Sequence, residues 1–150
     1  MKEQKMRVFK IVFNEDTFGI TQRSLKMLRN TLALTINHPI AVVCVPVNDL
    51  CCGFFVFDRK TKTAYFSGDG FRLDQAGEGG AGYRSASALF DIYGINAIMW
   101  EPIPLEEIYN LPEDKLEQKL MEVANSIATG LSEKDFRTPF KQKPHYVRRY

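Results

Sequence analysis

Residues 40–67 read IAVVCVPVNDLCCGFFVFDRKTKTAYFS and decide the fold. They contain three runs rich in β-branched and aromatic residues, which favour β-strands: Ile40–Val47, Gly53–Asp58 and Thr63–Ser67. Each run follows the previous one after five or four residues, and connections this short join antiparallel neighbours. This stretch therefore predicts a three-stranded antiparallel meander.

Further elements are predicted on both sides of the meander. Met6–Phe13 has the composition of a strand, and apolar residues recur at helical spacing from Thr21 to Ile36. After the meander, the patterns predict a helix in Tyr83–Tyr93, a strand in Ile95–Trp100 and a helix in Pro112–Thr129. The order β-α-β-β-β-α-β-α predicts an α/β (α+β) fold, with a mixed sheet of about five strands and helices packed on it. The link from the last meander strand to the next strand is long enough for a right-handed parallel crossover.

Length and composition predict a small soluble protein. The 150 residues, 45% hydrophobic and 25% charged, suit one globular domain at 1–136, followed by a basic, aromatic segment at 137–150. The longest clean apolar run, Ile40–Val47, is far shorter than the roughly 20 residues of a membrane helix. Charged residues interrupt the N-terminal region where a signal peptide would be apolar. We therefore expect a cytoplasmic protein.

Metal and thiol chemistry are not indicated by the sequence. The two histidines, His38 and His145, do not have metal-ligand spacing with each other or with a cysteine. The three cysteines, Cys44, Cys51 and Cys52, lack a second cluster of ligands and do not form a secreted-type disulfide framework. No metal site is predicted, and the cysteines are interpreted as small apolar residues.

Six of the ten glycines gather in Ser67–Arg84, which links the meander to the second helix. Glycine permits close approach of the backbone, and amide groups at a helix start attract anions. This segment predicts a phosphate-bearing ligand, such as a nucleotide or coenzyme A. The residues expected to bind it are Gly77, Gly79, Gly80, Gly82, Arg72 and Arg84. The candidate catalytic residues are Asp69, Asp74 and Glu78, as Mg²⁺ ligands or as a base.

Known phosphate-binding motifs match this segment only in part. Gly77–Gly82 satisfies G-x-G-x-x-G, and Glu101 follows nineteen residues later, where dinucleotide folds place a ribose-binding acid. However, the motif begins ten residues beyond Ser67, whereas the turn of a dinucleotide fold directly follows the strand. A Walker A loop is excluded because no Gly-Lys-Ser/Thr follows the glycines.

The order of elements from Ile40 to Trp100 resembles that of GNAT-type N-acetyltransferases, whose glycine loop holds the pyrophosphate of coenzyme A. Their signature is Arg/Gln-x-x-Gly-x-Gly/Ala, and residues 76–81, AGEGGA, supply its small residues. Ala76 stands where the family has a basic or amide residue. The resemblance implies coenzyme A as a ligand, and no catalytic residue is carried over by analogy.

The C-terminal segment suggests an alternative function. Its fourteen residues carry five cations and no acid, interleaved with Phe140, Tyr146 and Tyr150. Cations that hold phosphates beside rings that stack on bases are typical of nucleic-acid binding. The alternative is therefore a nucleic-acid-binding or processing protein that uses Lys141, Lys143, Arg148 and Arg149.

Two structural interpretations stay open. In the first, the glycine-rich segment is a solvated loop in which Arg72 and Arg84 pair with neighbouring acids. In the second, the chain is a homo-oligomeric domain without chemistry, and its basic tail docks on its own domain or on a second subunit.

Overall fold

The computed structural model describes residues 8–103 and 105–140 of the chain. Its strands are β1 (Lys10–Val12), β2 (Ile40–Pro46), β3 (Cys51–Asp58), β4 (Thr63–Phe66), β5 (Phe71–Arg72) and β6 (Ile98–Met99). Its α-helices are α2 (Thr21–Leu34), α3 (Gly77–Tyr93), α4 (Leu105–Tyr109) and α5 (Glu113–Thr129), and its short 3-10 turns are η1 (Glu15–Thr17) and η2 (Glu133–Asp135).

The strands form one mixed sheet in the order β1-β4-β3-β2-β6, with β5 paired to β3. The predicted meander is confirmed, because β3 is antiparallel to both β2 and β4. At the two edges, β1 is parallel to β4 and β6 is parallel to β2. Strands β4 and β6 therefore run in the same direction, as the predicted crossover through the helix requires.

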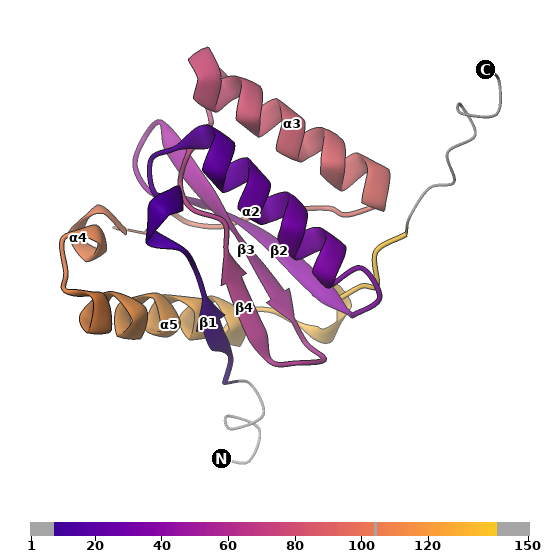
Figure 1. Ribbon diagram of the computed structural model, residues 1–150. Coiled ribbons are helices and arrows are strands. Elements are labelled where there is room, and N and C mark those ends of the chain that lie inside the picture. The colour runs from indigo at the N-terminus through magenta and orange to yellow at the C-terminus, as the bar shows by residue number, and fades with distance from the viewer. Residues whose placement is uncertain (1–7, 104, 141–150) are drawn as a thin grey trace, which may run out of the picture.

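Helices cover both faces of the sheet (Figure 1). Helices α2 and α3 lie together on one face, and α5 lies on the other. Alternate residues of β3 point into two cores: Phe54 packs with α2 and α3, whereas Phe55 and Phe57 pack with α5. Because both faces are covered, β2 and β3 are buried almost throughout, which explains their continuous apolar runs.

Three predicted boundaries were wrong. The strand predicted over Met6–Phe13 is limited to Lys10–Val12 (β1) within the described residues. Helix α3 begins at Gly77 rather than near Tyr83, so the last four glycines of the glycine-rich segment lie in its first two turns. Strand β6 has only two residues. Gly94 caps α3, and Ile95 packs into the core beside that helix, so the chain reaches the edge of β2 only at Ile98.

Helix α5 also protects the outer edge of β1. The side chain of Asn125 accepts a hydrogen bond from the Phe9 amide (2.7 Å) and donates one to the Phe9 carbonyl (3.1 Å). The carboxamide thus occupies the place of a further strand. Within the described residues, every helix is too short or too polar to cross a membrane.

Candidate functional site

The first half of the glycine-rich segment is fixed to the start of α2. Asp69 accepts a hydrogen bond from the Gly19 amide at 2.6 Å. Gly70 accepts one from the Thr21 hydroxyl at 2.6 Å and donates one to the Ser24 hydroxyl at 3.1 Å. The backbone of Gly70 and the Asp69 carboxylate are therefore used in holding the chain against this helix.

The charged residues before α3 also have local partners. The guanidinium of Arg72 donates to both carboxylate oxygens of Asp74, at 2.9 and 2.5 Å. These hydrogen bonds, together with one from the Ala76 amide, lower the pKa of Asp74 to about 2. Arg84 donates to the Gln75 carbonyl at 2.9 Å. The pairing of Arg72 with an acid agrees with the structural interpretation of this segment.

The glycines themselves permit close packing of α3. Gly79, Gly80 and Gly82 are buried. A Cβ atom at Gly80 would overlap the backbone of Gln75, and one at Gly82 would overlap the methyl group of Thr21. A larger residue at Gly82 would push α3 away from α2, and one at Gly80 would displace the chain directly before α3. These glycines therefore have a role in packing that does not require a ligand.

The three acids of this segment face different partners. Asp69 binds the α2 turn, Asp74 binds Arg72, and Glu78 is exposed on the first turn of α3. Over the described part of the chain, His, Cys, Asp and Glu side chains do not form a group of three that could hold a metal ion. The structure therefore does not bring the candidate catalytic residues together.

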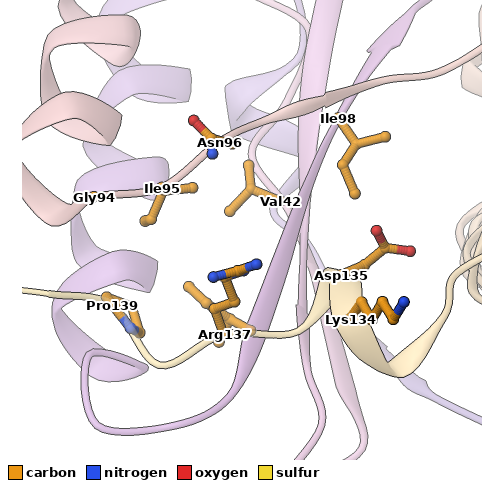
Figure 2. Close-up of a pocket in the computed structure, with 10 residues that line it drawn as sticks. Val42, Gly94, Ile95, Asn96, Ile98, Lys134, Asp135, Arg137 and Pro139 are labelled. Atoms are coloured by element: carbon orange, nitrogen blue, oxygen red, sulfur yellow. The ribbon is translucent and has the colours of Figure 1, made fainter.

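A pocket of about 220 Å³ lies at the opposite end of α3 (Figure 2). It opens at the edge of β2, between two segments that pair with different parts of that strand. Arg137 exchanges two backbone hydrogen bonds with Ile40, both 2.9 Å, whereas β6 pairs with Val43 and Cys44. The pocket lies along the part of the β2 edge between these two contacts. We call this site the basic pocket.

The basic pocket has an apolar floor and a polar rim. Ile40, Val42, Ile95 and Ile98 form the floor, and Asn96, Lys134, Asp135 and Arg137 contribute the polar side chains. In Figure 2 the guanidinium of Arg137 extends into the pocket, toward Val42 and the connection between α3 and β6. Lys134 is exposed, and its ammonium lies away from the guanidinium of Arg137.

The two cations of the basic pocket, Arg137 and Lys134, do not form ion pairs with acidic side chains of the described residues. Among the described residues, neither Arg137 nor Lys134 has a side-chain hydrogen bond or an ion-pair partner. The nearby acids are bound elsewhere: Asp135 accepts from the amide (2.7 Å) and hydroxyl (3.2 Å) of Ser132, and Glu133 pairs with Arg59 at 2.9 Å. The guanidinium of Arg137 is therefore available for an anionic ligand.

The C-terminal segment holds Arg137 in place. Beyond the pairing of Arg137 with β2, the Phe140 amide donates to the Tyr93 carbonyl at 2.7 Å. Residues 137–140, predicted as the start of a tail, thus lie against β2 and the end of α3. The other predicted nucleic-acid contacts, Lys141, Lys143, Arg148 and Arg149, lie outside the described residues.

The far end of the molecule has the opposite charge. A wider hollow of about 600 Å³ lies beside the first turn of α5 and is lined by Glu15, Glu113, Asp114 and Glu117. Four carboxylates and no cation contribute to its lining. An anionic ligand is therefore repelled from this end and attracted to the basic pocket.

The chain matches no known protein-family model, no curated protein and no solved structure. Its function is therefore inferred from the chemistry of its own residues.

Proposed function

We propose that the chain binds a phosphate-bearing ligand in the basic pocket. The observation that carries this proposal is the unpaired guanidinium of Arg137 inside a concave site. At the glycine-rich segment, by contrast, Arg72 and Arg84 are already hydrogen-bonded to the chain itself. Ligand binding on residues 77–82 stays a prediction, and the geometry supports the basic pocket better as the binding site.

The groups of the pocket suit a phosphate. A guanidinium presents parallel N–H donors that match two phosphate oxygens. The Asn96 carboxamide adds a donor on the opposite side, and Lys134 adds positive charge at the rim. The Asp135 carboxylate contributes one negative charge, so the three ionised side chains that the described residues contribute to the lining have a net charge of +1. This balance favours an anion over a neutral ligand.

The test measures thermal unfolding with inorganic phosphate, pyrophosphate and adenosine monophosphate, with adenosine as the uncharged control. A ligand at 100 times its Kd stabilises the native state by about 2.7 kcal/mol. We expect this stabilisation with at least one phosphate compound, and we expect Arg137→Ala to abolish it. Lys115→Ala is the matched control, since Lys115 is an exposed cation at the opposite end of α5.

Two results would contradict the proposal. One is that no phosphate compound raises the unfolding temperature. The other is that Arg137→Ala leaves the stabilisation intact whereas Arg84→Ala removes it, because the ligand would then bind at the start of α3.

A further inference from the structure

We infer that the phosphate-bearing ligand is a single-stranded nucleic acid, with one backbone phosphate at Arg137 and an adjacent base stacked on Phe140. This inference rests on the proposed function and names its substrate class. It depends on two features of the described structure, the size of the pocket and the exposed aromatic ring that follows it in the chain, and on the distribution of charge along the sequence.

The size of the pocket favours a polymer over a complete small cofactor. Sites that enclose a drug-sized ligand have volumes of about 300–1,000 Å³. The basic pocket, at about 220 Å³, is smaller. It accommodates a phosphate and part of a sugar, whereas the base of a nucleotide or the pantetheine arm of coenzyme A would lie outside. A nucleotide whose phosphate lies in the pocket therefore needs a second surface for its base.

Phe140 provides such a surface. It directly follows Pro139, which lines the pocket, and its side chain is 69% exposed. Of the large apolar side chains exposed in the described part of the chain, it is the most exposed and the only aromatic one. Its backbone is held by the hydrogen bond to Tyr93, and it packs near Gly94. Stacking of a base on such a ring contributes about 1–3 kcal/mol.

The distribution of charge along the sequence also favours a nucleic acid. The ten residues after Phe140 contain four cations, two tyrosines and no acid. Cations and aromatic rings in such a segment are the groups that contact phosphates and bases in single-strand binding. The acidic hollow at the other end of α5 repels a nucleic acid from the opposite side. Stacking requires a base free of its own partners, so a single strand is favoured over a duplex.

The test is fluorescence anisotropy on the full chain, with fluorescein-labelled oligothymidylate and oligouridylate of about twelve nucleotides. We expect binding that weakens steeply with salt concentration. Arg137→Ala should weaken the affinity and reduce the salt dependence by about one phosphate contact. Phe140→Ala should weaken the affinity at least fivefold, while pyrophosphate binding in the pocket stays unchanged.

The controls are Lys115→Ala for charge and Leu50→Ala for exposed apolar surface. Leu50 is 45% exposed in the turn after β2, at the opposite end of that strand from the pocket. Neither control should change the anisotropy curve. Because Arg137 and Phe140 are both exposed, their variants should unfold at nearly the same temperature as the unsubstituted chain.

The outcomes separate this inference from the proposed function. If pyrophosphate binds and the oligonucleotides bind no more tightly than pyrophosphate, the substrate class is wrong and the proposed function stands. If Arg137→Ala and Phe140→Ala bind the oligonucleotides as tightly as the unsubstituted chain does, the inference is overturned. Equal affinity for a duplex of the same length, or for an acidic peptide, would also overturn it. If no phosphate compound or oligonucleotide binds, both proposals fail.

Discussion

At the scale of single residues, the best-defined electrostatic contact is the pair Arg72–Asp74. The two hydrogen bonds from the guanidinium lower the pKa of Asp74 to about 2, below its ordinary value of 3.8. The lowered pKa means that the ionised carboxylate stabilises the fold above about pH 4. This contribution is lost as the pH falls toward 2. The exposed position of the pair keeps its energetic effect small.

We predict that Arg72→Gln raises the pKa of Asp74 toward 3.8, because the largest cause of its shift is removed. The measurement is a titration of the Asp74 carboxyl carbon by ¹³C NMR in both proteins. A midpoint near 4 in the unsubstituted chain would show that the pair is not formed in solution.

The three thiols should differ in reactivity. Cys44 and Cys52 are buried, whereas Cys51 is half-buried. Hydrogen bonding with Cys44, followed by burial, raises the pKa of the Cys52 thiol above its usual range. Since the thiolate is the reactive form, we predict that iodoacetamide at about pH 8 alkylates Cys51 first, and all three cysteines only after unfolding in urea. Peptide mass spectrometry reads out the sites, and native labelling of Cys52 as fast as Cys51 would contradict the prediction.

At the scale of elements, Asn125 closes the edge of the sheet. Its carboxamide binds the amide and the carbonyl of Phe9, the residue directly before β1. We predict that Asn125→Ala destabilises the fold by about 1–3 kcal/mol, because buried backbone groups lose their partners. Urea unfolding measures the change.

Ser126→Ala is the matched control for Asn125→Ala, because Ser126 is the next residue on α5 and is exposed. The control should change the free energy of unfolding by less than about 0.5 kcal/mol. Equal effects of the two substitutions would show that the carboxamide does not protect the edge.

Patterns within single segments of the sequence predicted most helices and strands. They failed where packing between elements determines where a helix or strand begins. The meander and α2 follow from alternation, apolar runs and helical spacing within single segments. The start of α3 was missed because glycine disfavours helices, yet Gly80 and Gly82 are required by the close approach of α3 to Gln75 and Thr21. The contact of Gly82 with Thr21 joins residues far apart in the sequence, so spacing along the chain does not reveal it.

At the scale of the whole molecule, the basic pocket is assembled from three distant segments. These are the start of β2, the connection from α3 to β6, and the chain after α5. The sequence drew attention to Arg137 and Phe140 through the basic, aromatic composition of the C-terminal segment. No sequence pattern predicted a role for Lys134 or Asn96, because that role depends on which segments pair with the edge of β2.

The charge difference between the two ends of the molecule has a measurable consequence. The acidic hollow and the basic pocket lie beyond opposite ends of α5. We predict that Glu113→Gln combined with Asp114→Asn increases the association rate of an oligonucleotide at low salt, since repulsion from that end decreases. The effect should disappear at about 1 M salt, where the Debye length is about 3 Å. Stopped-flow fluorescence measures it, and an unchanged rate at low salt would contradict the prediction.

The central claim is that a phosphate binds at the basic pocket and not at the start of α3. The most direct test is a titration of the ¹⁵N-labelled chain with pyrophosphate, followed by amide NMR spectra. We expect the largest shifts at residues 94–98 and 134–140, and we expect the amide signals of Gly77, Gly79, Gly80 and Gly82 to stay unchanged. Shifts concentrated on those four glycines, or no shifts at all, would contradict this claim.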